Sequence, residues 1–253
     1  MRISKPVTQI IAALILVSSQ AVCAVAGEVT VAVASNFLGT MQKIAKQFQM
    51  DTGHTVNLVN GSTGTLFAQI SHGAPYDLFL SADQHRVLLL NDAGKLLDGA
   101  HKPYALGKLV LFARDMDMLS EGIENSLKAD DIRHFAMADS TTAPYGLAAD
   151  QVLAALNLSG LIKQKAVIGT NIGQTFNFIA TGNAELGFVA LSQANQTDGK
   201  WIDISEDLYD PIVQEVGLLG RSADNEVAKE FYDYLTSDTA DALLKSAGYG
   251  VPD

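Results

Sequence analysis

The sequence predicts an α/β fold divided into two domains. Short apolar runs with β-strand character alternate with amphipathic stretches of helical periodicity, and no repeat or low-complexity tract interrupts this order. Such alternation favours mostly parallel sheets flanked by helices over an all-α or all-β fold. Two extended apolar runs, 108–113 and 211–219, bracket a block that has strands and helices of its own. We expect the chain to cross between the domains at these two runs.

The individual elements follow one another in strand-then-helix order. The predicted strands are 29–34, 55–60, 77–81, 108–113, 134–138, 166–169, 186–191 and 211–219. The predicted helices are 38–50, 64–72, 86–93, 146–156, 174–181, 226–236 and 238–247. Parallel strands need crossover connections of this kind, because a tight turn cannot join them.

The domain boundaries follow from the two bracketing runs. A simple arrangement has a first domain of 27–107 plus 218–253 and an inserted second domain of 108–217, with the two crossovers as a hinge. The chain after Leu219 is purely helical, which suits a returning segment that covers the first domain. One continuous sheet is the alternative that the sequence leaves open.

Residues 1–26 are predicted to be a cleavable signal peptide. A basic start precedes an apolar run over 10–17, and small residues follow at 21–26. The apolar run is too short to span a membrane. Cleavage after Ala26, or two residues earlier, removes Cys23, the only cysteine of the chain. We therefore expect a periplasmic protein whose stability rests on its apolar core and not on disulfides.

The charge balance excludes one class of partner and leaves another open. Seventeen Lys and Arg stand against 28 Asp and Glu, a formal net charge of −11. Nucleic acid is therefore not an expected partner. A small anion remains compatible, because charges beyond a Debye length of about 8 Å are largely screened at physiological salt. The local array of hydrogen-bond donors decides whether an anion binds.

Four turns share one pattern, in which a strand ends, small or polar residues follow, and a helix begins. These turns lie within 31–40, 60–66, 141–147 and 170–174. Each helix start offers free N–H groups and the positive end of a helix dipole, which together favour an anion. In open α/β sheets such turns lie at the carboxyl ends of the strands, where ligands bind.

Capping alone accounts for most Ser, Asn and Thr residues before helices. The joint composition of the four turns indicates more, because none of them contains Asp, Glu, Lys, Arg or His. Neutral donors without an acceptor suit a fully deprotonated oxyanion. A protonated phosphate would leave its O–H unpaired, at a cost of about 1–3 kcal/mol.

Several segments resemble the periplasmic molybdate-binding proteins of ABC transporters. They are 34–40, 60–64, 73–83, 143–148, 186–191, 231–235 and 247–249, and the resemblance covers essentially the whole mature chain. It implies a two-domain, type II-like periplasmic binding protein with a two-crossover hinge. It also implies a monomer without catalytic activity or cofactor, which captures molybdate, and tungstate with it, and delivers the anion to a cognate transporter permease.

The resemblance further implies a ligand set, in which molybdenum is bound only as molybdate. The residues implied are Ser35, Asn36, Ser62, Tyr145 and, through its backbone N–H, Ile172.

Two branches of this family differ at the ligand positions. One branch has serine at the position of Asn36, alanine at Tyr145 and tyrosine at Ala190, whereas the other uses asparagine and a tyrosine after proline. This chain resembles the second branch. Thr63 and Asn171 are expected to support the ligand residues from a second layer.

Two alternatives remain from the residues themselves. A secreted serine hydrolase could use Ser35 or Ser62 as nucleophile, although no Gly-x-Ser-x-Gly elbow is present and no histidine neighbours these turns. A binding protein for sulfate or another small anion would keep the same fold. Organic acids usually require an arginine fork, and none lies in the four turns. The five histidines are isolated, without the close pairs typical of zinc sites.

Overall fold

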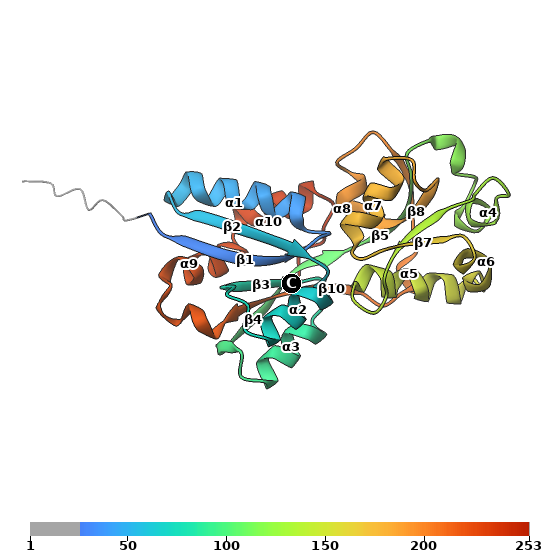
Figure 1. Ribbon diagram of the computed structural model, residues 1–253. Coiled ribbons are helices and arrows are strands. Elements are labelled where there is room, and N and C mark those ends of the chain that lie inside the picture. Colours follow the sequence, from blue (N-terminus) through green and yellow to red (C-terminus); the bar gives the residue numbers. More distant parts are fainter. Residues whose placement is uncertain (1–25, 253) are drawn as a thin grey trace, which may run out of the picture.

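The computed structural model describes residues 26–252. Two five-stranded sheets flanked by helices form two lobes that lie side by side (Figure 1). The predicted signal peptide over 1–26 falls outside the described residues, except for its last residue. Among the described residues, no helix combines the length and apolar character needed to cross a membrane.

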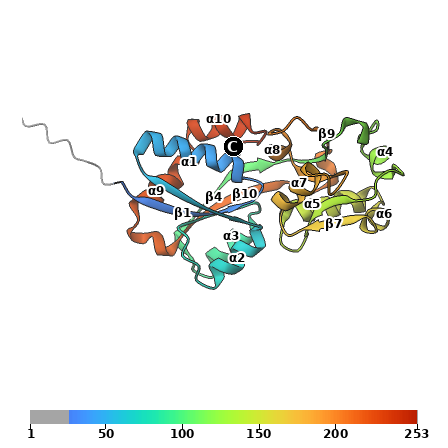
Figure 2. The ribbon, with the colours of Figure 1, turned by 45° about the horizontal axis from the view of Figure 1, so that its top comes forward.

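The first sheet contains β1 (Glu28–Ala34), β2 (Thr55–Gly61), β3 (Leu78–Ser81), β4 (Leu96–Gly107) and β10 (Ile212–Leu219). Its strand order is β2-β1-β3-β10-β4. Strand β1 is parallel to β2 and β3, whereas β10 is antiparallel to β3 and β4. One face is covered by α1 (Leu38–Thr52), α9 (Glu226–Tyr234) and α10 (Asp238–Ser246), the other by α2 (Thr63–Ser71) and α3 (His85–Asp92) (Figures 1 and 2).

Alternation along β1 assigns its side chains to the two faces of the sheet. Val31 and Val33 are fully buried in the cluster that contains Phe48 of α1. Ala32, between them, belongs to the opposite cluster with Leu66 of α2. Each fully buried side chain of this size contributes about 1.5–3 kcal/mol. The apolar pattern of one strand therefore holds helices against both faces and fixes where their first turns lie.

The second sheet contains β5 (Leu109–Ala113), β6 (Phe135–Ala138), β7 (Ala166–Gly169), β8 (Leu186–Ala190) and β9 (Lys200–Asp203). Its strand order is β7-β6-β8-β5-β9. The flanking helices are α4 (Ile123–Lys128), α5 (Pro144–Ala155) and α6 (Ser159–Lys163) on one face, with α7 (Ile172–Ala180) and α8 (Leu191–Ala194) on the other. Within the described residues there are also three 3₁₀ turns, η1 (Met116–Met118), η2 (Glu206–Leu208) and η3 (Gly220–Asp224).

The predicted two-domain α/β fold class is confirmed. Each sheet is mixed and not mostly parallel as predicted, because the strands that follow the crossovers, β5 and β10, run antiparallel to their neighbours. The sequence analysis missed β4 and β9. In β4 the apolar pattern is broken by Gly99, which has a φ of 70°, and by Pro103. Both are tolerated because β4 lies at the edge of its sheet.

The chain passes between the lobes twice. The first crossover joins β4, which ends at Gly107, to β5, which begins at Leu109. The return crossover lies between β9 and β10, over residues 204–211. Residues 212–217, which the sequence analysis assigned to the second domain, pair with β3 and β4 of the first sheet. An apolar extended run carries no signal of which sheet it joins, so the return at 218 was placed too late along the chain.

Candidate functional site

A small cavity lies where the two lobes meet, at the turns between strands and helices. Its lining consists of Ala34, Ser35, Asn36, Ser62, Thr63, Ala82, Ala143, Pro144, Tyr145 and Ile172. The structure thus brings together all five residues implied as ligands, with Thr63 beside them. Its volume is about 10 Å³, far below the roughly 300–1,000 Å³ of sites that enclose organic molecules. A volume of this size corresponds to roughly one water molecule, so this closed arrangement excludes organic molecules.

The capping residues of two helices face this junction. The Ser62 Oγ accepts the Thr65 N–H at 3.2 Å, at the start of α2. The Asn171 Oδ1 accepts the Gln174 N–H at 3.0 Å, at the start of α7. These are ordinary N-cap bonds, as the pattern of the turns predicts. They anchor the helix starts and leave other donors of the first turn free for a ligand.

Several backbone donors remain at the cavity. Thr63, Tyr145 and Ile172 lie in the first turn of α2, α5 and α7, where N–H groups have no partner within the helix. None of the hydrogen bonds among residues 26–252 uses these three N–H groups or that of Asn36. Three helix starts and one further turn therefore place N–H donors around one small space, which is the arrangement that favours an anion.

The two serines differ in how their hydroxyl groups are used. The Ser35 Oγ accepts the Gly173 N–H of α7 at 3.4 Å, so its own proton is available to a ligand. The Ser62 O–H donates to Thr65 Oγ1 at 2.7 Å and must rotate to reach an anion. Both side chains are at most 8% exposed.

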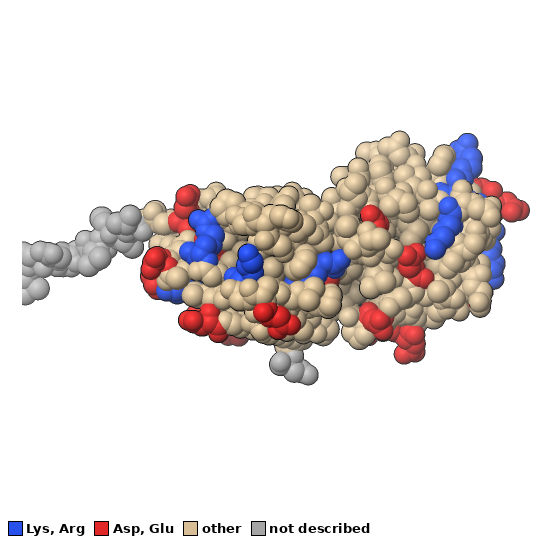
Figure 3. All heavy atoms as spheres, turned by 60° about the horizontal axis from the view of Figure 1, so that its bottom comes forward, with Lys and Arg blue, Asp and Glu red and all other residues tan. Residues whose placement is uncertain are grey.

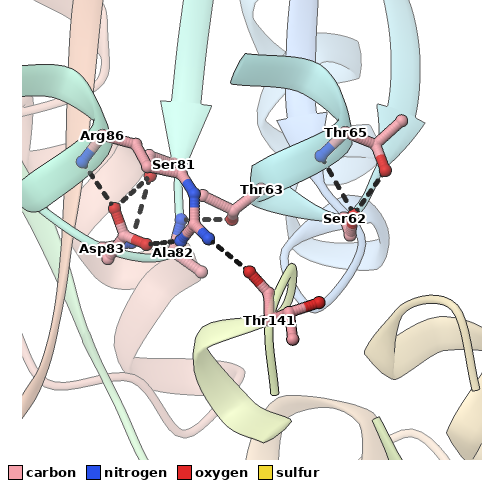
Figure 4. A network of polar contacts seen from close by, with 8 residues as sticks. All are labelled: Ser62, Thr63, Thr65, Ser81, Ala82, Asp83, Arg86 and Thr141. Atoms are coloured by element: carbon pink, nitrogen blue, oxygen red, sulfur yellow. Dashed lines mark hydrogen bonds and ion pairs between the residues drawn. The ribbon is translucent and has the colours of Figure 1, made fainter. Parts of the chain in front are cut away.

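Thr63 and its neighbours are shown in Figure 4. The Thr63 Oγ1 accepts the Ala82 N–H at 3.0 Å, which ties the end of β3 to the start of α2. Thr63 thus holds two cavity-lining segments together, as expected of a supporting residue. Asn171 lies outside the cavity and lines the groove beside it.

Asn36 is engaged within the protein through its side chain. Its Nδ2 donates to Gln214 Oε1 at 2.8 Å and to Tyr249 Oη at 3.1 Å. Its carbonyl oxygen accepts the Tyr249 hydroxyl at 2.9 Å and the Ser192 hydroxyl at 3.2 Å. The backbone N–H of Asn36 is therefore the donor that it offers to the cavity.

Tyr145 supplies the one phenol among the described residues that line the cavity. Burial raises the pKa of Tyr145 well above its ordinary value, and the neighbouring phenols Tyr249 and Tyr104 raise it further. The hydroxyl therefore keeps its proton at neutral pH. Its oxygen accepts the Gln214 Nε2 at 3.4 Å. Tyr145 is a neutral hydrogen-bond donor at the cavity.

The lobes touch each other directly on one side of the cavity. The Gly64 N–H of α2 donates to the Thr142 carbonyl of the second lobe at 2.8 Å. The Arg86 Nη2 donates to the neighbouring Thr141 carbonyl at 2.8 Å, and Asp83 pairs with the same guanidinium group (Figure 4). These contacts describe a closed arrangement of the two lobes.

Charged side chains stay out of the cavity lining, which contains no Asp, Glu, Lys, Arg or His among its described residues. On the face in Figure 3, basic and acidic side chains are interspersed over both lobes. A larger groove of about 490 Å³ shares Ser35 and Asn36 with the cavity and is likewise lined without charged residues. The electrostatics of the cavity therefore come from hydrogen-bond donors and helix dipoles.

A serine hydrolase would need a base beside its serine, and a metal site would need a cluster of ligating side chains. Within residues 26–252, the hydrogen bonds of Ser35 and Ser62 involve Gly173 and Thr65 and include no histidine. In the same part of the chain, no group of three or more His, Cys, Asp or Glu is arranged to hold a metal ion. The pairing of a serine with a general base that a hydrolase needs is not formed here.

Sequence reasoning missed the residues that connect the two lobes behind the cavity, namely Tyr104, Ser192, Gln214 and Tyr249. They form a buried network through Asn36 and Tyr145. One signal was available, since Gln214 and the adjacent Glu215 are the two polar side chains of a predicted strand that is otherwise apolar. The others are separated from their partners by long stretches of chain that no local pattern links.

The chain is similar to known solute-binding proteins over nearly all of its length. The family described as bacterial extracellular solute-binding protein matches residues 29–250. The molybdate-binding protein ModA of Azotobacter vinelandii is 43% identical over 235 residues, 91% of this chain and 93% of that protein. ModA of Rhodobacter capsulatus is 39% identical over 239 residues, 94% of each.

The solved structures give the same relationship. The periplasmic molybdate-binding protein of Azotobacter vinelandii superimposes with a TM-score of 0.85 at 36% identity, covering 89% of this chain and 100% of that one. With a family match over nearly all described residues and the same fold, the chain belongs to the bacterial extracellular solute-binding protein family.

Proposed function

We propose that this chain is a periplasmic solute-binding protein that captures molybdate, and tungstate nearly as well, and delivers the anion to the permease of an ABC transporter. It acts by binding and not by catalysis, as a monomer and without a cofactor. The relatives named as molybdate-binding proteins support this proposal. The observation that carries it is the interdomain cavity, which is lined by neutral hydrogen-bond donors from both lobes and by no charged side chain among its described residues.

The donor set favours a tetrahedral dianion. Backbone N–H groups of Asn36, Thr63, Tyr145 and Ile172 and the hydroxyls of Ser35, Ser62 and Tyr145 surround the space. Hydrogen bonds to a charged group contribute about 1.5–3 kcal/mol each, so several preorganised donors suffice for tight binding without a cationic side chain.

Domain closure provides the transport signal. The anion contacts donors from both lobes only when they are closed, so binding shifts the population towards the closed form. The bonds from Gly64 to Thr142 and from Arg86 to Thr141 belong to that form. A permease that recognises the closed form would receive only loaded protein.

Thermal unfolding of the ligand-stripped protein without residues 1–26 tests this function. The samples contain molybdate, tungstate, sulfate, phosphate or sodium chloride at matched ionic strength. An anion at about 100 times its Kd stabilises by roughly 2.7 kcal/mol, which raises Tm by about 5–10 °C for a chain of this size. We expect this shift with molybdate and tungstate alone.

The other outcomes are equally informative. A shift with sulfate alone would keep the binding mechanism and replace the substrate, since sulfate has the same charge and shape but a smaller radius. No shift with any anion would contradict the oxyanion function. Labelling of Ser62 by an activated-serine probe, abolished by Ser62→Ala, would favour the hydrolase instead.

A further inference from the structure

Gln214 occupies a central place behind the cavity. It lies on β10, immediately after the return crossover, and its side chain is fully buried. Its Oε1 accepts two hydrogen bonds, from Asn36 Nδ2 at 2.8 Å and from Tyr104 Oη at 3.0 Å. Two donors on this oxygen fix the orientation of the amide group. The Nε2 is thereby directed at the Tyr145 hydroxyl, 3.4 Å away in the other lobe.

The first crossover contacts the same hydroxyl. A Cβ atom added to Gly107, the last residue of β4, would lie 2.2 Å from Tyr145 Oη and 3.0 Å from Gln214 Nε2. Gly107 pairs with Ile212 across the β4–β10 ladder. The absent side chain of Gly107 therefore provides the room in which the phenol of one lobe meets the amide of the other.

We propose that Gln214, together with the bare backbone of Gly107, is a positioning device that makes Tyr145 an obligate donor towards the cavity, so that the site selects fully deprotonated oxyanions. This inference rests on the proposed function and deepens it. A phenol has one proton to donate. Because the Gln214 amide donates to the phenol oxygen, that proton is left for the ligand. A hydrogen phosphate, whose O–H needs an acceptor, gains none from Tyr145.

Replacing Gln214 by glutamate tests the donor role of the amide. The carboxylate still accepts hydrogen bonds from Asn36 and Tyr104. Unlike the amide it cannot donate a hydrogen bond to Tyr145, so the Tyr145 hydroxyl donates its proton to the carboxylate and not to the ligand. When protonated, the new side chain donates an O–H in place of the amide. Burial raises the pKa of such a carboxyl by up to several units. The hydrogen bonds that the carboxylate accepts oppose this rise, and we expect the variant to titrate between donor and acceptor within the range from about pH 6 to about pH 9.

The groups that face position 214 do not titrate in that range. They are the phenols of Tyr104, Tyr145 and Tyr249, and burial raises the pKa of each, that of Tyr249 to about 12. The adjacent carboxylate of Glu215 bonds instead to His101 and Gln84.

The experiment measures molybdate affinity by calorimetry from about pH 6 to pH 9. We expect the affinity of the Gln214→Glu protein to fall roughly 10- to 100-fold as pH rises, while the unmodified protein stays constant. In a Tyr145→Phe background the pH dependence should become clearly smaller, because only the charge repulsion between the carboxylate and the anion remains. If the pH dependence of the affinity is unchanged in the Tyr145→Phe background, the carboxylate acts on the anion by charge alone and the inference is overturned.

A second variant keeps the test independent of whether Gln214→Glu folds. Gly107→Ala should displace the Tyr145 hydroxyl and weaken molybdate binding about tenfold or more. The loss should be smaller in the Tyr145→Phe background, where only the contacts of 3.0 Å to the ring Cζ and to Gln214 Nε2 remain. Equal losses in both backgrounds would contradict the inference. An unmodified protein that binds no molybdate would instead refute the proposed function, so the two failures are distinguishable.

Discussion

Substitution of Tyr145 by phenylalanine is expected to weaken molybdate binding by roughly 10- to 100-fold. The phenol is 1% exposed, lines the cavity and keeps its proton because burial raises its pKa. Removing it deletes one hydrogen bond to an ion, which contributes about 1.5–3 kcal/mol. The ring remains, so the packing of α5 against its sheet is retained. Isothermal titration calorimetry of the two proteins measures the difference.

Tyr209→Phe is the matched control for this prediction. Tyr209 is also buried, at 7% exposure, and its hydroxyl accepts the Leu109 N–H at 3.2 Å without lining the cavity. Its removal should lower stability and leave the affinity for molybdate nearly unchanged. Equal affinity of the Tyr145→Phe and unmodified proteins would remove Tyr145 from the ligand set.

Substitution of Gly64 by alanine is expected to oppose closure of the lobes. A Cβ atom at this position would lie 2.9 Å from the Thr142 Cα and 3.1 Å from its carbonyl oxygen, both on the opposite lobe. These are backbone atoms that cannot rotate away, and overpacking typically costs about 1–3 kcal/mol. Because closure is linked to binding, the affinity should fall by about 10- to 100-fold. Small-angle scattering should show that molybdate compacts the variant less completely than the unmodified protein.

Gly160→Ala serves as the control for this second prediction. Gly160 lies in α6, and a Cβ atom there would meet no atom within 4 Å. The substitution should change neither affinity nor compaction. If Gly64→Ala also leaves both unchanged, the close approach of α2 to Thr142 has no part in the bound form.

The sequence predicts most of the fold because its local patterns agree with the tertiary structure. Strand 166–169 coincides with β7, and the helix predicted over 38–50 begins at the same residue as α1. Strand β4 was missed because Pro103 and Gly99 break its pattern, and only pairing with β10 makes it a strand. The return crossover was misplaced because pairing partners, and not composition, decide which sheet an extended run joins.

The candidate site, like the fold, could be predicted from the sequence only in part. The turns that contain Ser35, Ser62 and Tyr145 carry local signals, a strand end followed by a helix start, and the structure brings them to one cavity. Gln214 and Tyr249 bond to Asn36 across 178 and 213 residues of chain. Contacts of that separation follow from the tertiary folding of the first lobe, in which β10 and the C-terminal segment return to the end of β1, and no sequence window contains them.

The most direct test of the account is a crystal structure of the protein grown with molybdate, with data collected at the molybdenum absorption edge. The account predicts one strong anomalous peak in the cavity between Ser35, Ser62, Tyr145 and Ile172. It also predicts that the oxygen ligands of the ion accept hydrogen bonds from both lobes. A peak confined to the adjoining groove beside Asn171, or none at a saturating concentration, would contradict it.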